Sequence, residues 1–364
     1  MNCKRKKGIL LILFEQFKNL IISLIKMKNK ILKDTIQQLF AGSKGILAMD
    51  ESNGTCNKRF AAAMIPQTVE MRRTYRELIV TTPGLNESIG GAILYDETIR
   101  QQTKNGILFT DVLLNAGIIT GIKVDTGAKP MAGFSNEKIT EGLDGLRERL
   151  QEYKIMGARF AKWRGVITIG NGIPTTACIK TNVHALARYA ALCQEAGIVP
   201  IVEPEVLMTG NHSMQKCYDV TEQVLKALFD QLYQCKIDLE GMILKPNMVI
   251  AGTESAAQNT IDEVAEATVN CLRSSVPAAV PAVAFLSGGQ SPEDAAAHLN
   301  AMNKNFKSRL PWILTFSFAR AIQQPALDKW KGKEANVEEA QKLLYRRAKS
   351  DAAARHGEYI ALLE

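Results

Sequence analysis

A lysine follows a short apolar run in the stretch GMILKPNM, residues 241–248. Met242–Leu244 has the composition of a buried strand, and a charge at the end of such a strand is costly to remove from water. Three outcomes are open for Lys245: its side chain reaches solvent, pairs with a carboxylate, or stays neutral for chemistry. The third outcome would be catalytic, because a neutral lysine amine is a nucleophile toward carbonyl carbons.

Eight short apolar runs share this pattern, in which hydrophobic residues lead into a polar one. They are ILAMD (46–50), AILYD (92–96), GIKVD (121–125), FAKWR (160–164), PIVEP (200–204), GMILKP (241–246), VAFLSG (283–288) and WILTFSF (312–318). Their starts are about thirty to forty-five residues apart, which leaves room for a strand, a crossover helix and two loops. The pattern therefore predicts parallel strands that are buried on both faces.

The segments between these runs have helical periodicity. Val183, Leu186, Ala190 and Cys193 form one apolar stripe, and Gly197 is placed to end that helix. A second stripe comes before GMILKP and consists of Val224, Leu225, Leu228 and Leu232.

Eight β-α units in one chain predict a (β/α)₈ TIM barrel in a single domain, with an N-terminal extension and a polar helical tail over residues 326–364. An open doubly wound sheet is the alternative, but no G-x-G-x-x-G follows the first predicted strand.

In such a barrel the active site is built at the carboxyl ends of the strands, and polar residues gather there in this sequence. They are Asp50, Lys123, Lys162, Arg164, Glu203, Glu205, Lys245, Ser287 and Arg320. Each alone has an ordinary explanation, such as a helix cap or a half-exposed charge. Together, three lysines in one cationic mouth predict lowered lysine pKa values and a Schiff base with a carbonyl substrate. Glu203 and Asp50 would then transfer the protons.

Two segments are candidates for phosphate binding. LSGGQS, residues 286–291, places Gly288 and Gly289 after the seventh strand, where backbone N–H groups can approach an anion, and Arg320 follows the eighth. An ordinary Gly-Gly turn explains the motif equally well. A second cluster follows the first strand and consists of Ser52, Thr55, Lys58 and Arg59. Two anion sites on either side of Lys245 predict a substrate that is phosphorylated at both ends.

The formal net charge of +8 does not indicate nucleic-acid binding. Nine basic residues and one acidic residue lie within residues 1–33, so the rest of the chain is neutral. Residues 1–26 resemble a signal peptide in part, but polar residues interrupt the apolar run and no small-residue cleavage site follows. The run is too interrupted for a membrane span, and an amphipathic surface helix is an alternative. The preferred interpretation is a dispensable extension or a mis-assigned start before Met27.

Seven scattered cysteines without a C-x-x-C pair favour a reducing compartment over a disulfide framework. The four histidines do not have metal-ligand spacing, so no metal site is expected.

Taken together, ILAMDESNGTCNKR, GIKVDTG, GARFAKWR, PIVEPE, LKPNM and FLSGGQS resemble class I fructose-1,6-bisphosphate aldolases over residues 30–350, closer to the plastid and bacterial branch than to the muscle form. The resemblance implies aldol cleavage of fructose 1,6-bisphosphate into dihydroxyacetone phosphate and glyceraldehyde 3-phosphate, with no metal or other cofactor. It also implies a homotetramer of residues 27–364, in the cytoplasm or alternatively the plastid stroma, with no nucleic-acid or membrane partner.

The resemblance also implies roles for individual residues. Lys245 would form the Schiff base, Glu203 would be the general acid/base, and Glu205 would tune it. Asp50 would accept the proton of the C4 hydroxyl, while Lys162, Arg164 and Lys123 would surround the imine and substrate. The 1-phosphate would lie at Ser287, Gly288, Gly289 and Arg320, and the 6-phosphate end at Ser52, Thr55 and Arg59.

Two positions depart from the muscle form. Its chain ends in a tyrosine that assists enamine protonation, whereas this chain ends in Leu363 and Glu364, with Tyr359 nearby. Ala319 stands where muscle enzymes have glycine. Other Schiff-base barrels (a transaldolase or a deoxyribose-phosphate aldolase) are less favoured because of the paired anion clusters. A metal-dependent aldolase is disfavoured by the scattered histidines, and a non-catalytic scaffold by the intact polar set.

Overall fold

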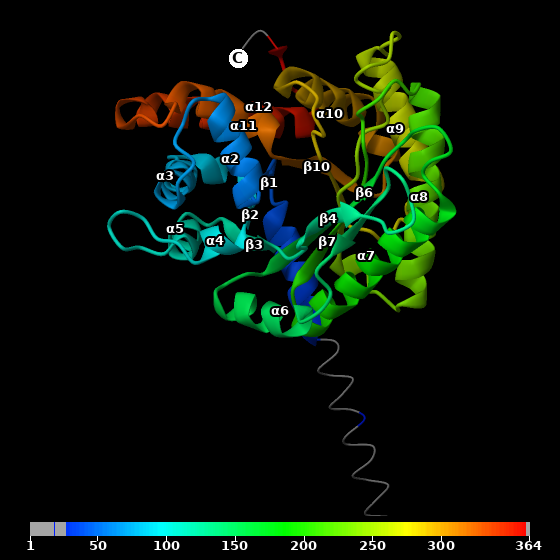
Figure 1. The fold of residues 1–364 in the computed structure, drawn as a ribbon, viewed down its shortest axis with the longest axis horizontal. Coiled ribbons are helices and arrows are strands. Elements are labelled where there is room, and N and C mark those ends of the chain that lie inside the picture. Colours follow the sequence, from blue (N-terminus) through cyan, green and yellow to red (C-terminus); the bar gives the residue numbers. More distant parts are fainter. Residues whose placement is uncertain (1–17, 19–26, 362–364) are drawn as a thin grey trace, which may run out of the picture.

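The computed structural model describes residue 18 and residues 27–361. Eight parallel strands form a closed barrel in the order β1-β10-β9-β8-β7-β6-β3-β2 (Figure 1). Their bounds are β1 Gly45–Ala48, β2 Ile89–Leu94, β3 Ile119–Lys123, β6 Phe160–Ile167, β7 Val199–Val206, β8 Ile243–Leu244, β9 Ala282–Phe285 and β10 Ile313–Phe318. All eight predicted strands are confirmed, because each overlaps one of the apolar runs.

The helices form the outer layer of the barrel (Figure 1). They are α2 Asn53–Ala62, α3 Val69–Val80, α4 Asp96–Ile99, α5 Phe109–Asn115, α6 Leu146–Ile155, α7 Thr176–Ala196, α8 Met214–Gln234, α9 Ile261–Ser275, α10 Pro292–Phe306, α11 Arg320–Trp330 and α12 Val337–His356. Both predicted stripes lie on buried faces, of α7 and α8, and α7 ends at Gly197 in the left-handed conformation, with φ 72°.

One pair of strands lies outside the barrel and was not predicted. β4 (Gly127–Pro130) and β5 (Lys138–Glu141) form an antiparallel hairpin between β3 and β6. Its residues are mostly exposed or half-buried, so they lack the apolar run that identified the barrel strands.

The predicted C-terminal helical tail is confirmed as α12. This helix is also packed, because Ala340, Leu344 and Ala348 are fully buried. α12 packs against α10 and α11. Beyond it, the backbone N–H of Tyr359 donates to Asn300 of α10 at 2.8 Å.

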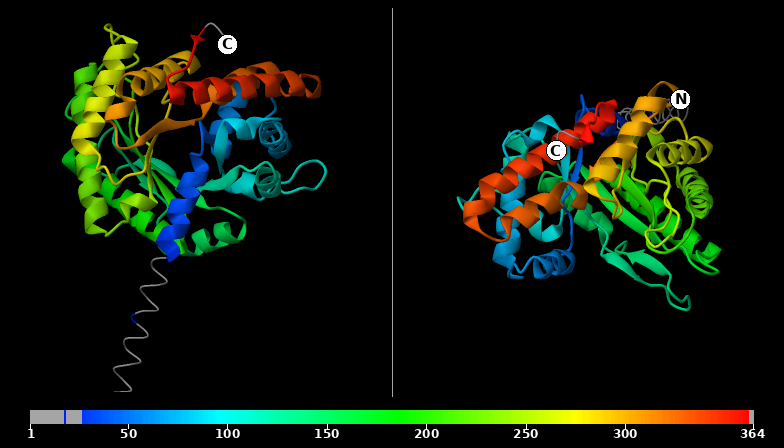
Figure 2. Two further views of the ribbon diagram at one scale, coloured as in Figure 1. Left: turned by 180° about the vertical axis from the view of Figure 1, so that it is seen from behind. Right: turned by 90° about the horizontal axis from the view of Figure 1, so that it is seen from above.

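A helix over residues 27–39 closes the N-terminal end of the barrel (dark blue in Figure 2). Leu32, Ile36, Leu39 and Phe40 belong to one buried cluster with residues of the barrel interior. Space for this helix depends on Gly90, where an added Cβ would lie 2.0 Å from the carbonyl oxygen of Leu39. Residues 1–17 and 19–26, which carry most of the predicted extension, lie outside the described residues.

An arginine from the end of the chain holds the end of this helix. The guanidinium of Arg355 on α12 is buried and donates to the backbone carbonyls of Phe40, at 2.7 Å, and of Lys44. Burial lowers the pKa of Arg355 to about 10. The two ends of the described chain are thus joined at one face of the barrel.

Candidate active site

Three adjacent strands place the central side chains of the site. Lys162 lies on β6 and Glu203 on β7, in a parallel register that pairs Arg164 with Glu203. Lys245 directly follows β8, and its backbone N–H donates to the carbonyl of Val202 at 2.8 Å. The side chains of Lys162, Glu203 and Lys245 are only 4–6% exposed.

Four charged groups form a continuous line across the barrel. The Nζ of Lys245 is 3.1 Å from Oε1 of Glu203, and the Nζ of Lys162 is 3.3 Å from Oε2 of the same carboxylate. Lys162 also pairs with Oδ2 of Asp50, at 2.7 Å. Glu203 therefore lies between two lysines, and Lys162 lies between two carboxylates.

Two further ion pairs flank this line. Arg164 lies 3.0 Å from Oε2 of Glu205, and Lys123 lies 2.5 Å from Oδ1 of Asp125. Asp125 also accepts the backbone N–H groups of Gly127 and Arg164. The sequence reasoning did not assign Asp125 to the site, although it is the polar residue that ends GIKVD.

The central cluster of the site is therefore balanced in charge, and Arg320 adds a positive charge at its edge. Four cations (Lys123, Lys162, Arg164, Lys245) face four carboxylates (Asp50, Asp125, Glu203, Glu205). A balanced cluster is expected for charges this deeply buried, since an unpaired buried charge is costly.

The pKa of Lys162 contradicts the prediction of lowered lysine pKa values. Burial favours the neutral amine, but the attraction of Asp50 and then Glu203 outweighs it, so the pKa of Lys162 is raised. For Lys123 the prediction holds, because the effect of burial exceeds the attraction of Asp125 and lowers the pKa of the lysine. The two lysines differ because Lys162 is attracted by Asp50 and by Glu203, whereas Lys123 is paired mainly with Asp125.

The carboxylates of the site divide into two groups. Burial opposes ionisation of Asp50, but Lys162 and Lys245 together bring its pKa down to about 2. Glu203 behaves similarly: burial is outweighed by Lys162 and Lys245, and its pKa is lowered. In Glu205 burial prevails over Arg164, so its pKa is raised. Glu203 is therefore held as a carboxylate, whereas Glu205 holds a proton more readily than an ordinary glutamate.

The turn over Ser287–Gly289 has the form of an anion-binding loop. Gly288 has φ 62° and Gly289 has φ 122°, conformations that favour glycine. Within the described part of the chain, the backbone N–H groups of these three residues donate to no protein acceptor. The exposed Arg320 lies beside them, since an added Cβ on Gly289 would be 3.6 Å from its guanidinium.

The second predicted anion cluster is brought together only in part. Ser52 caps α2, and its hydroxyl lies 3.1 Å from that of Thr55. Arg59 is engaged elsewhere: its guanidinium pairs with Glu51 and donates to Gln324 at 3.1 Å. Lys58 is exposed. The anion-binding role of this cluster stays a prediction.

Two further polar residues were missed by the sequence reasoning. Asn247 accepts the backbone N–H of Val206 at 3.0 Å and so holds the chain after β8 against β7. The Oγ of Ser317 on β10 is buried and, among the described residues, has no hydrogen-bond partner. Ser317 lies in a predicted strand segment and Asn247 directly follows one, but neither carries a charge that would have singled it out.

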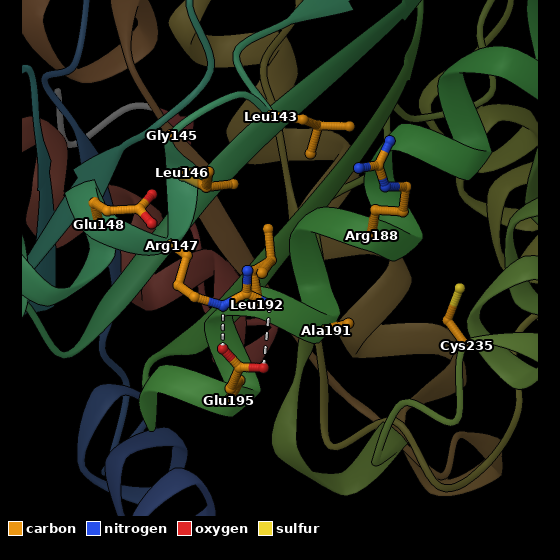
Figure 3. A pocket seen from close by; sticks show the side chains of 10 residues that line it. All are labelled: Leu143, Gly145, Leu146, Arg147, Glu148, Arg188, Ala191, Leu192, Glu195 and Cys235. Atoms are coloured by element: carbon orange, nitrogen blue, oxygen red, sulfur yellow. Dashed lines mark hydrogen bonds and ion pairs between the residues drawn. The ribbon is translucent and has the colours of Figure 1, made fainter.

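The described residues contain no group of three histidine, cysteine or acidic side chains that could hold a metal ion. Two cavities lie away from the predicted site residues. The larger, about 400 Å³, lies between α6 and α7 beside the Arg147–Glu195 ion pair of 2.6 Å (Figure 3). The other, about 350 Å³, includes Gln38 and Arg159, next to the helix of residues 27–39.

The fold and site define a class of protein: a (β/α)₈-barrel lyase with paired lysines and carboxylates at the carboxyl ends of its strands. Comparison with known proteins gives the particular family. Residues 31–363 match the model of the family "Fructose-bisphosphate aldolase class-I", and the chain belongs to this family.

Individual relatives agree with this assignment. A protein of Xanthomonas campestris named "Probable fructose-bisphosphate aldolase class 1" is 54% identical over 90% of this chain and 98% of its own. The muscle-type fructose-bisphosphate aldolase of Lethenteron camtschaticum is 48% identical, over 91% and 92% of the two chains. A solved fructose-bisphosphate aldolase of Plasmodium falciparum, in complex with TRAP and a small-molecule inhibitor, has a TM-score of 0.90 and 46% identity, covering 92% of this chain and 96% of that one.

The chain is therefore a carbon–carbon lyase of glycolysis that cleaves fructose 1,6-bisphosphate into dihydroxyacetone phosphate and glyceraldehyde 3-phosphate. Its substrate is a phosphorylated sugar. None of the described helices is both long enough and apolar enough to cross a membrane.

Proposed function

We propose that Lys245 is the residue that forms the Schiff base with the C2 ketone of fructose 1,6-bisphosphate. The observation that carries this assignment is the 3.1 Å separation between Nζ of Lys245 and Oε1 of the ionised Glu203. A lysine must lose its proton before it attacks a carbonyl. Glu203 lies at hydrogen-bond distance, ready to accept that proton.

The remaining steps follow from the line of charges. Attack of the amine gives a carbinolamine, and Glu203 returns a proton to the leaving hydroxyl, which departs as water and leaves a protonated imine. Asp50 accepts the C4 hydroxyl proton as the C3–C4 bond breaks, and the bonding electrons move into the imine to give an enamine. Lys162 stabilises both carboxylates by its ion pairs, of 2.7 and 3.3 Å. Protonation of the enamine and hydrolysis of the resulting imine release dihydroxyacetone phosphate.

The two phosphates are assigned to opposite sides of Lys245. Ser287, Gly288, Gly289 and Arg320 bind the 1-phosphate through free backbone N–H groups and a guanidinium. Ser52 and Thr55, with Arg59, lie at the 6-phosphate end, while Lys123 and Arg164 contact the sugar between them. Arg59 must leave Glu51 or share its guanidinium to take part.

Borohydride trapping tests the assignment. The protein is incubated with dihydroxyacetone phosphate, reduced, digested and mapped, and the adduct is expected on Lys245. The variant Lys245→Met should form no adduct. The activity of the wild-type enzyme should persist in excess EDTA. An adduct on another lysine, or loss of activity in EDTA, would overturn the mechanism.

We also infer a cytoplasmic homotetramer, with the plastid stroma as the alternative location, in which residues 27–364 are the catalytic unit and residues 1–26 an extension. The family match begins at residue 31, and the relatives from Arabidopsis thaliana that are 50–51% identical are named cytosolic aldolases. Sedimentation equilibrium at four times the chain mass supports the tetramer, and a monomer or dimer mass overturns it. Subcellular fractionation distinguishes the two locations.

A further inference from the structure

The carbonyl oxygen of Ser287 receives two hydrogen bonds from the same residue. The backbone N–H of Gln290 donates to it at 3.0 Å, which closes the turn, and the side-chain amide of Gln290 donates to it at 3.2 Å. The same amide nitrogen lies 3.6 Å from the sulfur of Met248. Gln290 therefore holds the turn of Ser287–Gly289 from its carboxyl side.

A histidine holds that glutamine in turn. Because the Ser287 carbonyl only accepts, the NH₂ group of Gln290 must face it, and the amide oxygen then faces Nδ1 of His298 at 2.6 Å. An amide oxygen cannot donate, so Nδ1 of His298 carries the hydrogen. His298 lies on α10 and is 8% exposed, and its own position is fixed by the packing of this helix.

We propose that Gln290 and His298 are positioning residues that pre-form the phosphate-binding turn of Ser287–Gly289 before substrate arrives. The inference rests on the proposed function, since it takes this turn as the 1-phosphate site. Neither side chain touches substrate; both act through the carbonyl of Ser287.

The physical reason lies in the two glycines of the turn. Gly288 and Gly289 both have positive φ, and glycine has more conformational freedom to lose than any other residue. If the turn became ordered only when the anion binds, the lost conformational entropy would reduce the binding affinity. The chain of hydrogen bonds from His298 through Gln290 to Ser287 orders the turn in advance, so that its three free N–H groups converge on the anion.

The variants Gln290→Met and His298→Leu test the proposal. Each removes one side-chain hydrogen bond of the chain and replaces the polar side chain by an apolar one of similar volume. Affinity for inorganic phosphate should fall, and the KM for fructose 1,6-bisphosphate should rise, by about fivefold to tenfold. This is the effect expected from the loss of one buried hydrogen bond. The kcat at saturating substrate should stay within about twofold, because the turn does not contact the reacting carbons. The variant His298→Gln, which retains an amide donor, should restore part of the lost affinity.

Unphosphorylated dihydroxyacetone separates positioning of the phosphate turn from general damage. Its borohydride trapping rate on Lys245 should equal that of the wild type in both variants. Phosphate affinity equal to the wild type, or equal losses for dihydroxyacetone and its phosphate, would overturn the proposal.

Gln194 offers a matched control, because it is another glutamine whose amide bonds a turn. Its Nε2 donates to the carbonyl of Asp238 at 2.7 Å, beside Gly241 and before β8, away from the turn of Ser287–Gly289. Gln194→Met should lower stability and leave phosphate affinity unchanged. If the wild-type adduct maps to a residue other than Lys245, the proposed function fails. If the adduct maps to Lys245 but the Gln290 and His298 variants bind phosphate normally, only the positioning role of Gln290 and His298 fails.

Discussion

In the proposed mechanism, Glu203 has two successive roles that depend on its neighbours. Two lysines, at 3.1 and 3.3 Å, keep its carboxylate ionised despite burial. Once the amine of Lys245 has attacked the ketone, the carbinolamine nitrogen no longer offers an ammonium group, and the carboxyl group of Glu203 returns its proton to the departing hydroxyl. The residue that accepts the first proton is thus also placed to donate the second.

The variant Glu203→Gln should lower kcat about a hundredfold or more, as expected for loss of a general acid/base, with a much smaller change in KM. Steady-state assays with fructose 1,6-bisphosphate measure both quantities. Folding should be retained, because glutamine has the same shape, and circular dichroism checks this. A variant with wild-type kcat would remove Glu203 from the mechanism.

Asp50 should make stability depend on pH at the acid end. Its pKa is lowered from 3.8 to about 2 in the folded protein, so its contribution is complete above about pH 4 and is lost as the pH falls through 2. The shift corresponds to about 2 kcal/mol. Urea unfolding should show that the difference in unfolding free energy between wild type and Asp50→Asn is smaller at pH 2 than at pH 5 by about this amount. A gap independent of pH would contradict the lowered pKa.

At the scale of elements, the strands were predictable because each is apolar and ends at a polar side chain. The hairpin of β4 and β5 was not, since its half-exposed residues carry no apolar run. Among the site residues, the position of Lys162 was predictable and its raised pKa was not. That pKa depends on Asp50, 112 positions away in the chain, and on a distance of 2.7 Å that only the closed barrel sets.

The helix of residues 27–39 depends on a glycine in the barrel wall. In Gly90→Ala the new Cβ would lie 2.0 Å from the Leu39 carbonyl, a backbone atom that cannot rotate away. We expect a loss of about 3 kcal/mol or more in unfolding free energy, as for severe overpacking. Thermal or urea unfolding measures it.

Gly54→Ala serves as the matched control for Gly90→Ala. Gly54 lies within α2, and nothing stands within 4 Å of an added Cβ. Alanine should therefore stabilise this helix by about 0.5–1 kcal/mol. If both variants unfold at the same denaturant concentration, contact with the Leu39 carbonyl is not what limits Gly90.

For the whole molecule, we expect the helix of residues 27–39 to be needed for a folded, active enzyme. A chain that starts at Met27 should keep wild-type kcat and melting temperature, whereas one that starts at Gly42 should be insoluble or inactive. The second chain would expose the interior cluster around Phe160 and Ile201, which Leu32 and Leu39 cover. Activity and differential scanning calorimetry compare the two, and an active chain lacking residues 27–39 would show that the helix is dispensable.

The bonds from Arg355 to Phe40 and Lys44 have a consequence for how the protein is made. They join residues 315 and 311 positions apart, so Phe40 and Lys44 emerge from the ribosome long before Arg355 does. Until Arg355 has emerged, the carbonyls of Phe40 and Lys44 lack their guanidinium donor. The N-terminal face of the barrel is completed only after α12 has been synthesised, and a nascent chain stalled before α12 presents an unfinished face to chaperones.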